Sequence, residues 1–123
     1  MIAMGRLRKA MRHIAAEKCE FTLFGLFMRA DAPGTWDLVV AAPWLKNGQL
    51  KAVGELTHLL SRTLGEQSLQ QLSRVVTLSH DNPGLDAILS TFHVDDGEVH
   101  VQKTNLFGLD IEDAYSFRAK RAA

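Results

Sequence analysis

One short stretch in the last third of the chain gathers four residues of the types that bind divalent metal ions: His93, Asp95, Glu98 and His100. Imidazole and carboxylate groups are the ligands that zinc and similar ions take in proteins. Asp96 and Gly97 stand between the two pairs, and an Asp-Gly pair between alternating runs is a strong signal for a tight β-hairpin turn. Directly opposed side chains on a hairpin lie about 5 Å apart at Cβ. The spacing therefore predicts that the four side chains share one face of a hairpin, within reach of a single ion.

The same four residues have a second interpretation that needs no metal. Side chains alternate across a strand, so the register of the turn places an apolar set on one face and the polar set on the other. The apolar set consists of Phe92, Val94, Val99 and Val101. Because the outer face of an antiparallel hairpin is expected to be polar, we prefer a solvated surface as the interpretation and expect no cofactor.

The sequence contains no motif that is typical of a particular catalytic chemistry. A P-loop, a dinucleotide-binding fingerprint, an H-E-x-x-H motif and a nucleophile elbow are all absent from it. Ser79, His80 and Asp81 have the residue types of a nucleophilic triad. Adjacent side chains on a strand point to opposite faces, however, and a triad is recognised by its geometry. The sequence therefore favours a protein that is not an enzyme, and it assigns no catalytic residue.

A stretch near the N-terminus resembles the start of a minimal nucleotidyltransferase. It consists of Leu23-Phe24-Gly25 followed by Trp36-Asp37-Leu38-Val39-Val40. In that family a glycine–serine pair and a later D-x-D motif on a second strand hold the nucleotide and the metal ions. Here Leu26 stands at the position of the serine and Thr35 at that of the first aspartate, which leaves only Asp37. Since paired carboxylates are needed to hold two metal ions, the resemblance does not predict an active enzyme of that type.

The balance of charge favours association between protein molecules. The chain carries 14 basic and 14 acidic side chains, and a net charge near zero promotes association. Trp36 and Trp44 bracket the second predicted strand, and large aromatic side chains at an exposed sheet edge are typical interface anchors. Packing in the core is the alternative role for both. We therefore expect a homo-oligomer and interpret the protein as a non-enzymatic association or binding module.

Two groups of basic residues point to a different partner. Arg8, Lys9, Arg12 and His13 cluster on one side of a predicted N-terminal helix, and Arg118, Lys120 and Arg121 form a basic tail. They provide an alternative function, a weak nucleic-acid binder that works through the N-terminal helix. A formally neutral protein has no overall field to steer it to nucleic acid, so this alternative is not the preferred one. The sequence names no small-molecule ligand.

Length and cysteine content bound the class of protein. A chain of 123 residues has the usual size of one domain, so we interpret residues 1–123 as a single α+β domain. Cys19 is the only cysteine, and the lack of a disulfide framework suits the reducing cytoplasm. The apolar run over 21–28 is too short to span a bilayer as a helix. We therefore expect a cytoplasmic protein without a membrane partner.

Hydrophobic spacing predicts the elements of the first part of the chain. A helix is expected over 6–18, where Leu7, Met11 and Ile14 form an apolar stripe, and a second helix from a cap at Asn47 to position 64. Strands are expected over 21–29, 36–42 and 74–79. The first of them is predicted to be central because both of its alternating sets are apolar. Gly25 in its middle indicates a bulge or the close approach of another backbone.

The last part of the chain has less regular patterns. Residues 83–92 fit a short helix with Pro83 at its first position, but a strand from about Ser90 would supply a partner for the hairpin, and we prefer the strand. A strand is expected over 98–107 and an acidic turn over 110–113. A last strand is expected over 114–119, with a C-terminal helix as the alternative.

These elements predict an α+β fold. The expected order is a helix, two strands, a helix and then four further strands. Consecutive strands joined by tight turns form a mostly antiparallel sheet. The sequence therefore predicts a mostly antiparallel sheet of five to six strands with two helices packed on one face.

Overall fold

The computed structural model describes residues 4–18, 20–32, 34–45, 50–65, 72–78, 83–92, 98–106 and 109–120. Within these residues the helices are α1 (Met4–Glu17), α2 (Leu50–Leu64) and α4 (Pro83–Thr91). The strands are β1 (Leu23–Arg29), β2 (Trp36–Ala41), β3 (Leu72–Thr77), β4 (Val99–Leu106) and β5 (Leu109–Ala119). None of the described helices is long and apolar enough to cross a membrane.

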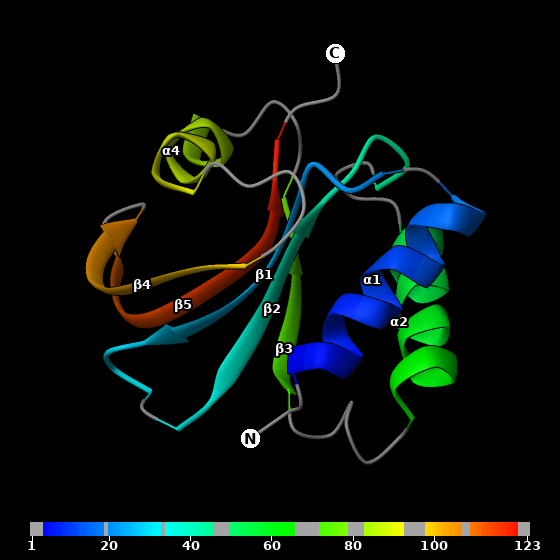
Figure 1. Ribbon diagram of the computed structural model, residues 1–123, viewed down its shortest axis with the longest axis horizontal. Coiled ribbons are helices and arrows are strands. Elements are labelled where there is room, and N and C mark those ends of the chain that lie inside the picture. Colours follow the sequence, from blue (N-terminus) through cyan, green and yellow to red (C-terminus); the bar gives the residue numbers. More distant parts are fainter. Residues whose placement is uncertain are drawn as a thin grey trace.

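The strands form one sheet in the order β3-β2-β1-β5-β4, which confirms the predicted α+β class and the mostly antiparallel sheet (Figure 1). The pairs β2–β1, β1–β5 and β5–β4 are antiparallel, whereas β2 and β3 are parallel. A parallel pair needs a crossover connection, which is usually a helix. Here α2 is that crossover, and it returns the chain to the outer side of β2. The predicted central position of β1 is confirmed.

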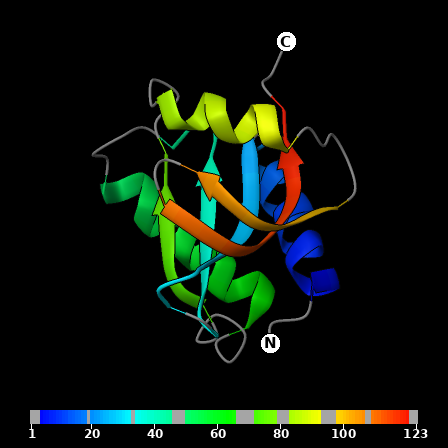
Figure 2. The ribbon, with the colours of Figure 1, turned by 90° about the vertical axis from the view of Figure 1, so that its left-hand side faces the viewer.

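Helices α1 and α2 lie on one face of the sheet and α4 lies on the other, as Figures 1 and 2 show. The apolar stripe of α1 is buried as predicted, and Leu56, Leu60 and Leu64 of α2 are buried as well. One core lies between these two helices and the sheet; its helical members include Leu7, Ile14, Leu56 and Leu60. The prediction of two helices on one face is confirmed, and α4 is an addition to it.

Residues 83–91 are helical, so the preferred strand from about Ser90 is wrong for Ser90 and Thr91, and the helical alternative is confirmed. The physical reason is burial at helical spacing. Leu85, Ile88 and Phe92 are all buried in a second core on the sheet face that α4 covers. The rings of Phe92 and Phe27 lie 5.7 Å apart, which ties the end of α4 to the sheet.

The C-terminal hairpin is formed by β4 and β5, with Leu106 paired to Leu109. The predicted last strand is confirmed, but it begins earlier than expected, so the acidic turn over 110–113 is wrong. Cross-strand partners explain the difference, because Asn105 donates to Asp110 at 3.1 Å and His100 bonds to Asp113 at 2.6 Å. The Asp96-Gly97 turn lies outside the described residues.

Gly25 stands where the backbones of β1 and β5 approach closely. A Cβ at this position would lie 2.9 Å from the carbonyl oxygen of Tyr115, and the register of β1 against β5 shifts between Phe24 and Gly25. Both the predicted bulge and the predicted close approach are confirmed. Cys19 and the predicted helix cap Asn47 lie outside the described residues.

Candidate functional site

A pocket of about 460 Å³ lies where α1 and α2 meet. Four basic side chains line it: Arg6, Lys9, His13 and Arg62. The remaining lining residues are Ala10, Thr63, Leu64 and Gly65. The pocket therefore combines a small apolar floor with a cationic rim.

The helical repeat explains how α1 contributes three of the basic groups. Arg6, Lys9 and His13 are spaced by three and four residues, so they lie on one side of the helix. The stripe that includes Leu7 and Ile14 is turned to the core and is fully buried. Sequence reasoning found Lys9 and His13 on this face but did not include Arg6.

The antiparallel packing of α1 and α2 brings Arg62 to the same place. Lys18 follows the end of α1 and pairs with Glu55 near the start of α2. Arg6 near the start of α1 and Gly65 after the end of α2 line the same pocket. The last turn of α2, with Arg62 in it, therefore lies beside the first half of α1. No pattern in the sequence signals this meeting.

All charged residues among the described lining of the pocket are basic, although the whole chain is neutral. Glu17 is the only acidic residue of α1, and it lies 3.7 Å from His13 on an exposed part of the helix. Arg62 lies close to the carbonyl end of α2, where a cation is favoured by the helix dipole. The guanidinium groups and the ammonium group of the rim can thus bind an anion.

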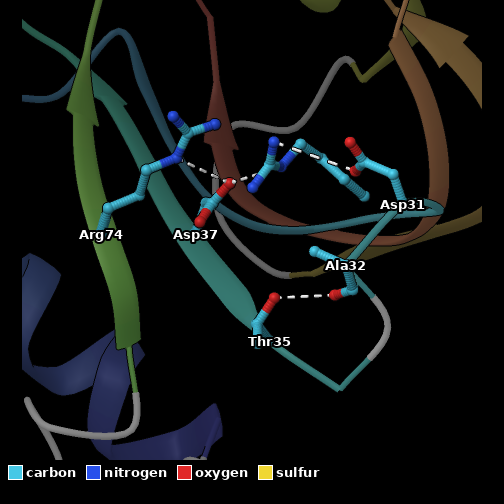
Figure 3. Close-up of polar contacts among 6 residues, drawn as sticks. Asp31, Ala32, Thr35, Asp37 and Arg74 are labelled. Carbon is cyan, nitrogen blue, oxygen red and sulfur yellow. Dashed lines mark hydrogen bonds and ion pairs between the residues drawn. The ribbon is translucent and has the colours of Figure 1, made fainter.

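A second polar cluster lies on the opposite face of the sheet and is formed by Arg29 of β1, Asp37 of β2 and Arg74 of β3. Figure 3 shows Asp37 and Arg74 with their contacts. The Oδ2 atom of Asp37 lies 3.4 Å from Nε of Arg29 and 3.1 Å from Nε of Arg74. Asp37 is paired with Phe27 across β1 and with Arg74 across β3. Since Phe27 belongs to the core beneath α4, the cluster lies on the α4 side of the sheet.

Burial accounts for this ionic cluster. The side chain of Asp37 is only 5% exposed, and a buried carboxylate is costly unless it is paired. Its Oδ1 atom is buried and accepts no hydrogen bond from the described residues. Asp37 is also the only aspartate that this chain has at the two positions of the D-x-D motif in the nucleotidyltransferase resemblance. Here its Oδ2 atom faces two guanidinium groups, an arrangement that stabilises a carboxylate and does not assemble a metal site.

The predicted metal ligands are only partly described. His100 lies on β4, where its Nε2 atom is 2.6 Å from Oδ1 of Asp113 and its ring stacks on Tyr115 at 4.1 Å. Glu98 is exposed just before β4. His93 and Asp95 lie outside the described residues, so the four-residue cluster stays a prediction.

Asp113 is the partner of His100 that sequence reasoning missed, because the residue was assigned to a turn. Its position two residues before Tyr115 on β5 places both on the side of the sheet where His100 lies. In the described part of the chain, no three His, Cys, Asp or Glu side chains gather as a set that could hold a metal ion.

The two tryptophans differ in their surroundings. Trp36 is 6% exposed and its ring lies 5.7 Å from that of Tyr115. The expectation that it flanks a sheet edge is wrong, because β2 lies between β1 and β3. Trp44 is half-buried, with Lys18 Nζ 5.5 Å from its ring centre and Phe21 at 6.3 Å. An interface role for the pair stays a prediction.

Comparisons with models of protein families, with curated proteins and with solved structures gave no match. The residues of the two clusters and their geometry are therefore the basis for an assignment of function.

Proposed function

We propose that the protein is a binding module that holds the phosphate backbone of nucleic acid at the pocket between α1 and α2. The observation that carries this proposal is the convergence of Arg6, Lys9, His13 and Arg62 around one pocket. Arginine and lysine are the side chains that neutralise backbone phosphates, and this contact supplies most of the non-specific affinity for nucleic acid. The proposal develops the N-terminal basic helix that the sequence offered as an alternative.

The distribution of charge supports weak binding that depends on salt. Four basic side chains line one pocket, while the net charge of the chain is zero. A local patch without an overall positive field attracts phosphate at short range and steers association little. Contacts to phosphate also carry no sequence information, so the binding is expected to be insensitive to base sequence.

The basic tail adds less to this surface than its composition indicates. Arg118 donates from Nε to the carbonyl oxygen of Phe21 at 3.0 Å, and its Nη1 atom lies 4.0 Å from Glu20. Its guanidinium group is thus used to fix the end of β5 beside the start of β1. Arg121 lies outside the described residues. The pocket is therefore the surface on which the proposal rests.

The test is the affinity for a short fluorescein-labelled single strand and for the matching duplex, measured by anisotropy over a range of salt concentrations. Arg62→Gln is expected to lower the slope of log K against log salt by about one unit, since one phosphate contact is lost. Lys103→Gln is the matched control, because Lys103 is exposed on β4, a strand far from the pocket. Equal slopes for the two variants, or binding that does not weaken with salt, would overturn the proposal.

Two further proposals have weaker support. Self-association is supported by the zero net charge and by the position of β3 at one end of the strand order, since an unpaired strand edge is a template for a second chain. For the alternative of a metal site, which is not the preferred one, the relevant observation is the His100–Asp113 pair, because a carboxylate commonly orients a ligating histidine. The chain's single cysteine supports a cytoplasmic location for all of these functions.

A further inference from the structure

We propose that Arg29 and Arg74 form a clamp for one oxyanion group, a phosphate or a carboxylate, on the α4 side of the sheet. In this clamp Asp37 is a positioning residue that orients both guanidinium groups. The site is separate from the pocket, because the pocket lies between α1 and α2 on one face of the sheet, whereas Asp37 is paired with Phe27 on the α4 face. It therefore extends the protein's binding chemistry beyond the proposed nucleic-acid surface.

Each arginine contacts Asp37 at Nε, and Asp31 is the described carboxylate near Nη1 of Arg29. Both guanidinium groups approach the same oxygen of Asp37 through Nε, at 3.4 and 3.1 Å. A guanidinium group is planar and presents its donors as a rigid fork, so an anchored Nε fixes the direction of the Nη groups. One shared carboxylate oxygen thus sets the orientation of two forks, and such forks match the geometry of phosphate and carboxylate oxygens.

Exposure increases from the carboxylate to the two cations. The side chain of Asp37 is 5% exposed, that of Arg29 27% and that of Arg74 52%. The negative charge is therefore buried beneath two positive charges that reach solvent. In Figure 3, Asp37 lies between Arg74 and the turn that carries Asp31. Of the three groups, the two guanidinium groups are therefore the ones that an anion from solvent can reach.

Asp31 is the acidic residue that competes for this site. Its Oδ1 atom lies 3.9 Å from Nη1 of Arg29, and its side chain is 74% exposed. This separation is longer than a hydrogen bond, and exposed ion pairs contribute little free energy. A bound oxyanion can therefore replace Asp31 beside Arg29 at small cost.

Apolar neighbours strengthen the electrostatic attraction at the clamp. Phe27 is the cross-strand neighbour of Asp37, and Val39 is the next residue of β2 on the same face; both are buried. Val76, two residues after Arg74 on β3, is half-buried against the same core. Charges at the border of an apolar region are less screened than charges in open water.

The test follows the Nε–Hε resonances of Arg29 and Arg74 by NMR while inorganic phosphate or acetate is added at constant ionic strength. The expected result is a saturable shift of both resonances, and the two titrations distinguish phosphate from carboxylate as the preferred group. Arg74→Gln is expected to weaken binding about tenfold, because one of two charge-assisted forks is lost. Asp31→Asn is expected to strengthen it about threefold, since a competing carboxylate is removed.

The controls separate the clamp from the pocket. Arg62→Gln removes a cation from the pocket. It is expected to leave the phosphate-induced shifts of the Arg29 and Arg74 resonances unchanged, whatever its effect on nucleic-acid binding. Arg74→Lys keeps the charge but loses the fork, so its affinity should stay clearly below that of the native protein. Shifts that do not saturate, or wild-type affinity in Arg74→Lys, would overturn the clamp.

The positioning role of Asp37 has its own test. Asp37→Asn keeps the shape of the side chain and removes the charge that holds both Nε groups. The expected result is weaker phosphate binding although the site has become more positive, because the forks are no longer oriented. Tighter binding in this variant would contradict the role. If the variant does not fold, Arg74→Lys still decides whether fork geometry or charge alone binds the anion.

Discussion

At the scale of single residues, Asp37 is a buried carboxylate that requires a cationic partner. Its carboxylate has almost no access to water and lies within 3.4 Å of two arginine Nε atoms. The side chains of Arg29 and Arg74 stay partly solvated, so each of them loses less hydration than Asp37 does. The stability of the cluster therefore depends more on the presence of a partner for Asp37 than on which arginine provides it.

The double variant Arg29→Gln with Arg74→Gln is expected to lower the free energy of unfolding by about 3 kcal/mol or more, because it leaves an uncompensated buried carboxylate. Arg74→Gln alone is expected to cost about 1 kcal/mol, since Arg29 remains as a partner. Urea denaturation measures both values. Adding Asp37→Asn to the double variant should recover part of the loss. A double variant that is as stable as the single one would contradict this account.

His100 provides the second prediction at this scale. His100→Ala is expected to lower stability by about 1 kcal/mol, because the variant loses the stacking on Tyr115 and the hydrogen bond to Asp113. Added zinc is expected to leave the melting temperature of the native protein unchanged. A clear rise that is absent in the variant His93→Ala with His100→Ala would show a metal site instead, since a ligand that binds only the folded state must stabilise it.

At the scale of elements, β1 is the strand on which the sheet depends, because it joins β2 on one side and β5 on the other. Side chains alternate between the two faces of this strand. Phe24 and Leu26 therefore belong to one core and Leu23 and Phe27 to the other. Gly25 is required in the middle of this strand because the backbone of β5 leaves no room for a Cβ.

Gly25→Ala is expected to lower stability by about 2 kcal/mol, because the new Cβ would meet a backbone oxygen at 2.9 Å and the strands would have to separate. Gly54→Ala is the matched control. A Cβ on Gly54 would meet nothing within 4 Å, and alanine in a helix interior is favoured over glycine by about 1 kcal/mol. Thermal denaturation should therefore show opposite signs for the two substitutions, and the same sign would contradict the packing of β1 on β5.

At the scale of the whole molecule, the two faces of the sheet carry different polar groups. Helices α1 and α2 cover one face and α4 covers the other (Figures 1 and 2). The basic pocket lies at the α1–α2 pair, and the arginine cluster lies on the α4 side. The pocket is lined by basic side chains alone among its charged residues, whereas the two arginines of the cluster lie beside Asp37 and Asp31. We therefore expect separate anionic ligands for the two faces, one at the pocket and one at the arginine cluster.

The remaining prediction concerns the size of the assembly. We expect a species larger than the monomer at micromolar concentration, because the chain has no net charge and β3 has no further strand on its outer side in the described part of the chain. Multi-angle light scattering over a range of concentrations measures this directly. A mass of 13.6 kDa at every concentration would contradict it. Trp36 is not expected to contribute to the interface, since its side chain is buried within the chain.

The sequence by itself determined the elements whose pattern is local. The stripe of Leu7, Met11 and Ile14 predicted α1, because the spacing of side chains along a helix is set by its own repeat. A run that is apolar at both of its alternating sets predicted β1 and its central position. Gly25 was also identified correctly. Its place within a strand, where a side chain would normally pack, was the signal.

Only the tertiary structure decided the features that depend on distant segments. Residues 83–91 fit two patterns, and burial of Leu85 and Ile88 against the far face of the sheet selected the helix. The same holds for the candidate sites. Arg62 reaches the pocket through the antiparallel packing of α2 on α1, and Arg74 reaches Asp37 because β3 pairs in parallel with β2. A pair of charges that are far apart in the chain leaves no local pattern in the sequence. The attraction between such charges is screened by salt, and the packing of apolar faces is what brings them together.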